Sequence, residues 1–559
     1  MLALHHHLRK GRAFVFERFR MAILAVILLL SACGGPNQAR PAAVQVGVAR
    51  APTGGAAPAP AAMAPSQPTL RSVMPLDAAL QHRVAVLQRL SFGVNGHLLD
   101  LVDAQGGERA WLEAQLRPGS DDGLPDDVAR QVQGFRAHKD AIVPLVLDIE
   151  RKRKDARILP DEAQRKAVLD GLRETANQMG REAQLELLWR ETYTRWQLQE
   201  LMTAFWLNHF SVFQAKSDVQ LLAGDYINRA IRPNVFGSFR KLLQATARHP
   251  AMLRYLDNDR NAAGKLNENF ARELLELHTL GVDGGYTQKD VQELARVLTG
   301  FGVQSSADPL RPGKPGSDAG RREGLLEYAP ARHDFADKML LGERLHSHGW
   351  AEFDEVLDRL ARHPATIHHV SVQLATFLLG AAPDAELLEH MRATWVASDG
   401  DLRRLMLVVI DSPQFAASLQ QGFKGPQRYV VSALRLAYED RPVLNLQPAL
   451  NWLNRMQQAP LARVTPDGYP LLSAAWMGSG QFATRFDIAR QLGYGSVGLF
   501  RQEGSKSEEQ PAFPQLATPF YYRAIEPGLS EGTRQSLSQA RSPQEWTLLL
   551  LASPELMRY

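Results

Sequence analysis

The 559-residue sequence contains a single cysteine, Cys33, so no intramolecular disulfide bond can form. Its main part also lacks an excess of charge of either sign. The formal net charge is +4, and residues 1–32 carry five basic residues against one acidic residue, which leaves the remainder neutral. A neutral body lacks the positive field that nucleic-acid-binding proteins normally present. We therefore expect no nucleic-acid partner.

Familiar catalytic motifs are missing as well. The sequence has no His-Glu-x-x-His zinc-protease motif, no Gly-x-Ser-x-Gly nucleophile elbow and no Walker-type phosphate loop. Residues 493–498 match Gly-x-Gly-x-x-Gly, but the preceding residues 486–492 have the pattern of a helix, where a dinucleotide site requires a strand. We interpret these glycines as a turn. The sequence assigns no cofactor and no metal.

Long apolar runs are rare, and the run MAILAVILLL at residues 21–30 is about half of the roughly twenty residues that span a bilayer. It follows a basic stretch, as in a secretory signal peptide. Directly behind it, Leu30-Ser31-Ala32-Cys33-Gly34 resembles the bacterial lipobox, whose cysteine is acylated and becomes the first residue after cleavage. The alternative is an ordinary signal peptide with an accidental cysteine. We predict a lipoprotein signal peptide in residues 1–32 and lipidation of Cys33.

The lipobox resemblance also implies a location. An aspartate after the lipidated cysteine usually marks retention in the inner membrane, and here that position is Gly34. We therefore expect a lipid-anchored protein of the cell envelope, held at the outer membrane and facing the periplasm. Its membrane partner would be reached through the acyl chains on Cys33.

Two further segments follow the signal peptide. Residues 33–70 are rich in Ala, Pro and Gly and almost free of charge, so they cannot bury enough surface to fold and are expected to form a flexible tether. Residues 71–559 are expected to form one helical domain. There, aromatic residues recur at steps of three and four along the chain, which is typical of buried helix faces. The aromatic residues of this pattern are Trp189, Tyr193, Trp196, Trp206, Phe210 and Phe213.

The same region shows little sequence evidence for β-strands, because no long alternating runs of Val, Ile or Thr occur. We predict an all-α fold, a multi-helix globular body with long irregular loops. Residues 304–323 and 501–519 are the longest of the predicted loops.

The run NENFARELLELHTLGVDGGYTQKDV, residues 267–291, predicts a helical hairpin. Its first helix is amphipathic, with Asn267 as the N-cap and Gly281 as the C-terminal stop. His278 falls on the apolar face and needs a buried partner. It is either a core histidine held by a carbonyl or carboxylate, or a residue that binds metal or transfers protons. The second helix begins with a capping box between Thr287 and Asp290.

The turn of this hairpin invites comparison with a calcium loop. With Asp290 at the twelfth position of an EF-hand loop, Asp283 and Gly284 occupy the fifth and sixth positions. The first and third positions hold Thr279 and Gly281, so two carboxylate ligands are missing. A turn followed by a helix cap explains the pattern better than a calcium site.

Several motifs resemble those of a large bacterial family, the domain of unknown function DUF1800, over roughly residues 76–559. They are residues 267–291 and 295–301, Arg89-Leu90-Ser91-Phe92-Gly93, Trp206-Leu207-Asn208-His209-Phe210, Arg248-His249-Pro250-Ala251-Met252, His333-Asp334 with Lys338 and Gly342, His363-Pro364-Ala365-Thr366, and Thr465-Pro466-Asp467-Gly468-Tyr469-Pro470. The resemblance implies a secreted or envelope-associated protein without an established activity. It also implies a possible envelope partner, because members are often encoded beside proteins that resemble alkaline-phosphatase-like hydrolases. Unlike members with a twin-arginine signal, this chain has no Arg-Arg pair in its leader.

The polar residues within these motifs are the candidates for chemistry. The catalytic candidates are His209, Glu273, His278, His333 and Asp334, and the residues expected to form a structural network are Glu268, Arg272 and Glu276. In helical proteins, such side chains can converge on a metal or acid–base site.

Each candidate also has a structural interpretation. His209 lies beside an aromatic helix face and can be a half-buried structural histidine. Asp334 can cap a segment that starts at Phe335. The line of Glu268, Arg272 and Glu276 can be a solvated stripe or a buried network.

Two hypotheses of function follow. In the first, the helical body is an accessory protein that binds a partner protein or a polymer of the envelope. In the second, it is a hydrolase or metalloenzyme that works through His209, Glu273, His278 and His333, which requires at least three of them to meet in a cleft. We favour the binding role, because an enzyme of this length usually shows a recognisable catalytic spacing.

Overall fold

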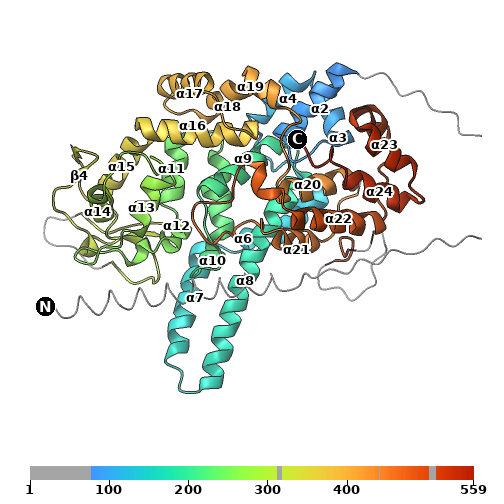
Figure 1. The fold of residues 1–559 in the computed structure, drawn as a ribbon. Helices are drawn as coiled ribbons and strands as arrows, with labels where there is room; N and C mark the ends of the chain where they lie inside the picture. Colours follow the sequence, from blue (N-terminus) through green and yellow to red (C-terminus); the bar gives the residue numbers. More distant parts are fainter. Residues whose placement is uncertain (1–76, 311–317, 440, 496, 503–511) are drawn as a thin grey trace, which may run out of the picture. The chain divides into compact units, whose positions relative to one another are not determined.

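The structure is a computed structural model that describes residues 77–310, 318–439, 441–495, 497–502 and 512–559. The predicted signal peptide, Cys33 and the tether lie outside the described residues. The predicted helical body is confirmed, because helices dominate the described chain and strands are few and short (Figure 1).

The first half of the described chain is almost entirely helical. Its elements are α2 (Ala78–Leu90), α3 (Gly96–Ala104), α4 (Glu108–Gln115), α5 (Asp126–Gln133), α6 (Arg136–Lys139), α7 (Ile142–Arg157), α8 (Glu162–Tyr193), α9 (Gln197–His209), α10 (Val219–Asp225), the π-helix η1 (Tyr226–Ile231), the 3-10 helices η2 (Arg232–Asn234) and η3 (Asn258–Arg260), α11 (Phe239–Ala247), α12 (Pro250–Tyr255), α13 (Asn269–Glu276) and α14 (Gln288–Val297).

The second half carries the strands and the remaining helices. Its helices are η4 (Pro330–Arg332), α15 (Trp350–Arg362), α16 (Pro364–Leu379), α17 (Ala385–Ser398), α18 (Leu402–Ile410), α19 (Pro413–Ser418), α20 (Pro426–Ala437), α21 (Gln447–Arg455), η5 (Ser473–Trp476), α22 (Ser479–Tyr494), η6 (Tyr521–Ile525), η7 (Glu526–Gly528), α23 (Glu531–Ser538) and α24 (Pro543–Leu551). α22 confirms that a helix, not a strand, precedes the Gly-x-Gly-x-x-Gly run. The helix also includes the first two residues of the run, and Gly495, at φ +67°, is its C-cap, so the predicted turn begins only there.

Two small antiparallel sheets follow α14, neither of which was predicted from the sequence, and one of their strands lies within residues 304–323, which were predicted to be a loop. β1 (Phe301–Val303) and β2 (Arg321–Glu323) flank β3 (Leu326–Tyr328), and β4 (Met339–Leu340) pairs with β5 (Glu343–Arg344). In the first sheet, Phe301 is opposite Tyr328 and their rings lie 4.9 Å apart. Strands of two or three residues are too short to show an alternating pattern, which explains the miss.

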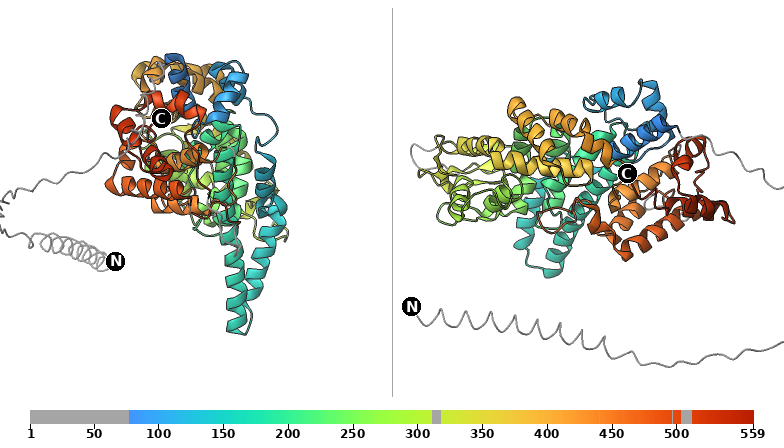
Figure 2. Two further views of the ribbon diagram at one scale, coloured as in Figure 1. Left: turned by 90° about the vertical axis from the view of Figure 1, so that its right-hand side faces the viewer. Right: turned by 45° about the horizontal axis from the view of Figure 1, so that its top comes forward.

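Helices α7 and α8 run antiparallel and extend away from the other described helices as a long hairpin (Figures 1 and 2). The buried residues of α8 all lie at or after Ala176, so its first half is largely solvent-exposed. At the far end of the hairpin, Ile158 is 81% exposed. The second half of α8 packs against α10 and α20 and belongs to the core.

The core contains most of the aromatic residues that the sequence pattern predicted to be buried, but Trp196 is only partly buried and lies outside the core. Trp189 and Trp206 are 1% and 0% exposed, and the rings of Trp206 and Phe210 stack 6.0 Å apart. Phe239 of α11 packs against both of the latter rings. Because α8 and α9 are held rigidly by this packing, the polar residues at their C-terminal ends have fixed positions.

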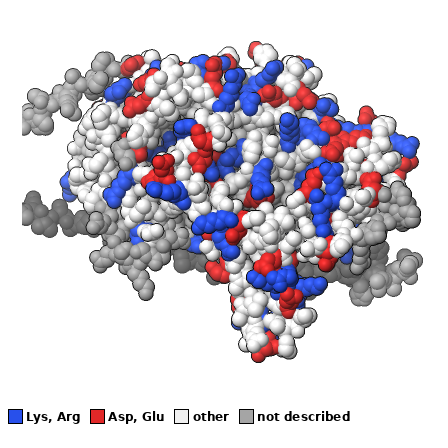
Figure 3. Space-filling model, turned by 180° about the vertical axis from the view of Figure 1, so that it is seen from behind, with Lys and Arg blue, Asp and Glu red and all other residues white. Residues whose placement is uncertain are grey.

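No helix in the described ranges is long and apolar enough to cross a membrane. On the face shown in Figure 3, basic and acidic side chains are interspersed. This distribution agrees with the neutral composition of the chain after its leader.

Candidate functional site

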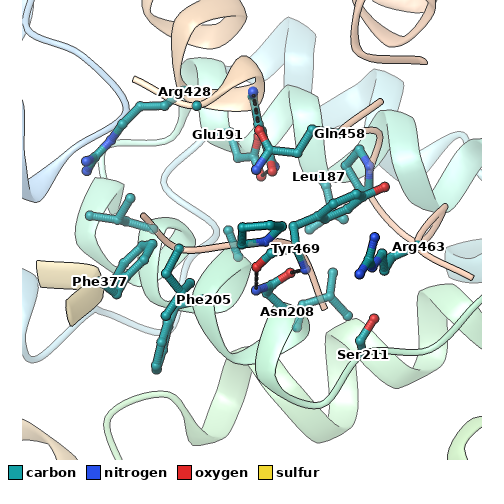
Figure 4. Close-up of a pocket in the computed structure, with 18 of the residues that line it drawn as sticks. Leu187, Glu191, Phe205, Asn208, Ser211, Phe377, Arg428, Gln458, Arg463 and Tyr469 are labelled. Carbon is teal, nitrogen blue, oxygen red and sulfur yellow. Dashed lines mark hydrogen bonds between the residues drawn. The ribbon is translucent and has the colours of Figure 1, made fainter. Parts of the chain in front are cut away.

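Two of the motifs named above meet in space. Asn208, in the last turn of α9, accepts a hydrogen bond from the Tyr469 backbone N–H at 2.7 Å and donates one to the Tyr469 carbonyl at 2.9 Å (Figure 4). A side-chain amide that binds both polar groups of one residue fixes that backbone position firmly. The loop that contains Thr465–Pro470 in sequence is therefore held against the end of α9.

Gly468 allows this close approach. Its φ is +70°, a conformation that favours glycine, and a Cβ atom there would lie 2.3 Å from the Asn208 carbonyl oxygen. Any other residue at this position would separate the loop from α9.

An ion pair stiffens the same loop. Arg463 donates to both carboxylate oxygens of Asp467, at 3.1 and 2.8 Å, and the Thr465 hydroxyl also donates to Asp467. Desolvation opposes ionisation of Asp467, but these donors outweigh it and lower its pKa. Asp467 thus remains ionised and paired, and the positive charge of Arg463 is compensated.

The loop and α9 enclose two adjoining cavities of about 120 and 380 Å³. Figure 4 shows the smaller cavity. Together we call them the cleft. The residues that line both cavities are Phe205, Asn208, Arg463, Tyr469, Pro470 and Leu471. The smaller cavity adds Glu191, Gln427, Gln458 and Trp476, and the larger adds His209, His369, Asp467 and Leu472.

Glu191 of α8 is the most unusual residue of the cleft. Its side chain is fully buried, Gln427 donates to its Oε1 atom at 2.6 Å, and its Oε2 atom has no hydrogen-bond partner among the described residues. Burial, with the nearby Glu200, raises the pKa of Glu191 well above its usual value. Burial therefore favours the protonated form of Glu191, which presents an O–H donor at the wall of the cleft.

His209 and His278 bind one another's backbone. The His209 Nε2 atom lies 3.2 Å from the His278 carbonyl oxygen, and the His278 Nδ1 atom lies 3.0 Å from the His209 carbonyl oxygen. Their ring centroids are 6.0 Å apart, and His278 is 1% exposed. The predicted burial of His278 and its need for a partner are confirmed. The partner is a carbonyl, as in the structural interpretation.

A third histidine completes this cluster. His369 of α16 lies 6.2 Å from His209 between ring centroids, and its Nε2 atom is 3.3 Å from the Leu277 carbonyl. Burial lowers the pKa of all three imidazoles, that of His278 to about 4. Since the rings are neutral at neutral pH and bind carbonyls, this cluster joins α9, α13 and α16.

The predicted helix 268–280 is shorter in the structure. α13 begins at Asn269 and ends at Glu276, so its N-cap is Glu268 and not Asn267 as predicted. Asn267, one residue earlier, accepts a bond from the Asn269 N–H at 3.0 Å. Beyond Glu276, His278 N–H binds the carbonyl five residues earlier, which widens the last turn. Gly281, at φ +84°, therefore ends this turn and not the helix itself.

The network predicted on this helix is partly present. Arg272 forms an ion pair with Glu268 at 3.1 Å, whereas Glu276 accepts a bond from the Tyr286 hydroxyl. Burial raises the pKa of Glu273, and Glu276 adds to the shift. Asp467 also contributes, so Glu273 lies within electrostatic range of the cleft without lining it. The capping box between Thr287 and Asp290 is confirmed.

His333 lies in a different polar cluster, with Thr299, Lys338 and Glu352. Its Nδ1 atom lies 2.7 Å from the Thr299 carbonyl, and its Nε2 atom lies 3.5 Å from Glu352, which forms a buried ion pair with Lys338 at 2.8 Å. Neither His333 nor Asp334 lines the cleft. The structure therefore brings His209 and His278 together but places His333 elsewhere.

Asp334 stabilises the loop after η4. It accepts a bond from the Ala336 N–H at 2.9 Å, but the segment that starts at Phe335 is not a helix, so the predicted helix cap is wrong. Arg296 binds both carboxylate oxygens of Asp334, at 2.8 and 3.2 Å, and this bond lowers the pKa of Asp334. The Asp334 carboxylate therefore accepts hydrogen bonds from the loop backbone and from the Arg296 guanidinium, which is a structural role.

Among the described residues, no three His, Cys, Asp or Glu side chains are arranged to hold a metal ion. Residues 85–558 match a family model described as a protein of unknown function, DUF1800. The chain belongs to the DUF1800 family. No match was found among curated proteins or among solved structures. The predicted resemblance is confirmed.

Asn208 and Asp467 belong to motifs of the family resemblance, but neither was predicted to be a site residue. Glu191 was not predicted at all, because a glutamate within an amphipathic helix looks like a surface residue. The one available signal was the aromatic pattern around Trp189, which places residue 191 inside a buried stretch of α8.

Proposed function

We propose that this DUF1800 member is a lipid-anchored accessory protein of the bacterial cell envelope, whose cleft binds an uncharged saccharide segment of an envelope polymer. The observation that carries the proposal is the loop of residues 465–470, which is clamped to α9 and forms one wall of a preformed cavity. Preformed cavities with a few fixed polar groups are typical of ligand sites.

The chemistry of the cleft wall favours a neutral ligand. Burial favours the protonated form of Glu191, which offers a donor, and the charge of Arg463 is balanced by that of Asp467. The side-chain amides of Gln427 and Gln458 add donors and acceptors, and the aromatic rings of the wall supply apolar surface. A saccharide combines hydroxyl groups with apolar ring faces and therefore suits both kinds of wall.

The proposed location depends on Cys33 and the resemblance of residues 30–34 to a lipobox. Two or more acyl chains would hold the protein at the membrane stably, and residues 33–70 would let the helical body reach a polymer nearby. Cys33→Ala should remove the lipid and release the protein from the membrane fraction. The check is metabolic labelling with a fatty acid analogue, followed by fractionation. Full membrane retention of the variant would contradict the anchor.

The enzyme alternative has less support. Its proposed working set requires at least three candidates in one cleft, and only His209 lines the cavities. The ring nitrogens of His209 and His278 that have partners bind backbone carbonyls. These contacts favour a structural role for both histidines. A hydrolase-like envelope partner, as the family resemblance implies, stays a separate prediction.

Binding of the full chain to soluble peptidoglycan glycan fragments tests the proposed function. Leu472 lines the larger cavity of the cleft and is 47% exposed, so Leu472→Glu should fold normally and weaken binding at least tenfold. Leu444 is 48% exposed and lines neither cavity of the cleft, which makes Leu444→Glu a matched control. Calorimetric titration checks both. Equal affinities of the two variants, or no binding by the unaltered protein, would overturn the proposal.

A further inference from the structure

A separate cavity of about 190 Å³ lies between the N-terminal and C-terminal parts of the described body. Side chains from α2, α20 and η6 line it, together with residues after α24. Its apolar wall includes Val84, Leu436 and Phe520. This cavity shares only Tyr559 with the cleft among the described lining residues, so its chemistry can be tested independently.

Two reactive side chains meet at the wall of this cavity. Lys424, just before α20, places its Nζ atom 3.2 Å from the Oγ atom of Ser432, in the second turn of α20. Both side chains line the cavity, and the residues are 2% and 8% exposed. Hydrogen-bond contact between a hydroxyl nucleophile and a potential base is the arrangement that nucleophilic catalysis requires.

The surroundings hold both side chains in place. The Lys424 Nζ atom also donates to the Leu556 carbonyl at 2.8 Å, and the Lys424 backbone N–H donates to the Met557 carbonyl. Gly93 packs against Ser432, because a Cβ atom at residue 93 would lie 2.7 Å from the Ser432 Cβ. The Ser432 hydroxyl donates to the Tyr429 carbonyl of its own helix at 3.0 Å, and the backbone of Gly93 lies on its other side. To react, the hydroxyl must rotate its proton from the Tyr429 carbonyl to the Lys424 Nζ atom.

The charge around Lys424 favours its neutral form. Burial lowers the pKa of Lys424 to about 7, and Arg428 and Arg485 add to the shift. The other titratable groups that face the cavity are Tyr429, Glu555, Arg558 and Tyr559. Glu555 is occupied by Ser530 N–H and by the Thr533 hydroxyl. A neutral amine has a lone pair that can accept the Ser432 proton while it still donates to Leu556.

We propose that Ser432 and Lys424 form a nucleophile–base dyad that hydrolyses esters whose short apolar acyl chain binds in this cavity. Dyads of serine and lysine are one of the variants of the serine-nucleophile mechanism. The largely apolar wall and the small volume select a short hydrocarbon acyl group.

The reaction proceeds in two balanced steps. In the first step, the Ser432 Oγ atom forms a bond to the ester carbonyl carbon, and its proton moves to the Lys424 Nζ atom. The bond to the alkoxide breaks, and Lys424 returns the proton to the leaving oxygen. In the second step, water attacks the acyl-serine while Lys424 takes a proton from water and returns it to Ser432. The products are a carboxylic acid and an alcohol.

The direct test is covalent labelling of the full chain by an alkyl fluorophosphonate. Ser432 displaces fluoride, so the intact mass should increase by one phosphonyl group, and peptide mapping should place it on Ser432. The labelling rate should rise as the pH increases through about 7, where Lys424 becomes neutral. Failure to label, or labelling of another residue, would overturn the proposal without any variant.

Variants separate the dyad from a structural contact. Ser432→Ala and Lys424→Arg should each lower hydrolysis of p-nitrophenyl butyrate at least a hundredfold, because arginine cannot deprotonate. Ser371→Ala replaces a serine of α16 that is 2% exposed and lines neither this cavity nor the cleft, so it should keep full activity. Thermal unfolding of each variant checks that it folds. Undiminished hydrolysis by folded Ser432→Ala would contradict the dyad.

Discussion

Asn208 and Tyr469 are separated by 261 residues in sequence and are joined by two hydrogen bonds between the amide of the first and the backbone of the second. Asn208→Ala removes both bonds, so the Tyr469 N–H and the Tyr469 carbonyl each lose a hydrogen-bond partner. At about 1 kcal/mol for each bond, the free energy of unfolding should fall by about 2 kcal/mol. Urea denaturation measures this change.

Asn208→Asp is the informative companion, since it keeps an acceptor for Tyr469 N–H and loses the donor. It should be less destabilised than Asn208→Ala. Equal stability of Asn208→Ala and the unaltered protein would show that the clamp contributes nothing.

Gly468 should be intolerant of a methyl group. Gly468→Ala would combine an unfavourable φ of +70° with a contact of 2.3 Å to the Asn208 carbonyl. Gly264→Ala is its control, because Gly264 has φ +77° and open space around the Cβ position. The control should lose only about 1 kcal/mol of stability from backbone strain, and Gly468→Ala should lose more. If thermal denaturation showed equal losses of stability in Gly468→Ala and Gly264→Ala, Gly468 would not be in close contact with α9.

The burial of His278 should make stability depend on pH. Its pKa is lowered from 6.5 to about 4, so the unfolded chain binds a proton before the folded chain does. The stabilisation is present above pH 6.5 and is lost as the pH falls towards 4. In His278→Leu, the decrease in the free energy of unfolding between pH 7 and pH 4 should be smaller than in the unaltered protein, by at most about 3 kcal/mol. The measurement is the free energy of unfolding at pH 7 and pH 4, with the exposed His390→Leu as control. An unchanged pH dependence in His278→Leu would contradict the burial of a neutral imidazole.

The burial of Glu191 should make the protein less stable as the pH rises, which is opposite to the effect of His278. The pKa of Glu191 in the folded protein is raised above the ordinary value of 4.5, so its protonated form is stabilising below pH 4.5 and this contribution is lost as the pH rises. Glu191→Gln keeps a neutral side chain at every pH. The variant should therefore be more stable than the unaltered protein at pH 8 and nearly equal to it at pH 4. Glu386→Gln, at an exposed position on α17, should leave the stability unchanged at both pH 8 and pH 4.

The sequence was sufficient for features that depend on local pattern. The helical class, the capping box at Thr287 and the burial of His278 follow from periodicity and spacing, and all are confirmed. The short strands left no pattern to detect.

The cleft could not be predicted in the same way. Its walls come from α8, α9 and residues 458–476, and no local pattern shows that Glu191, Asn208 and Tyr469 meet. The Lys424–Ser432 contact spans eight residues and looks local. Its environment, however, is created by α2 and by residues near the C-terminal end of the described chain.

Amide hydrogen exchange of the full chain, with and without peptidoglycan glycan fragments, tests the ligand cleft most directly. Addition of the fragments should slow exchange in residues 465–472 and at the C-terminal end of α9 and leave exchange in α23 unchanged. Fragment binding that leaves residues 465–472 unprotected, or that protects α23 instead, would contradict the proposed ligand cleft.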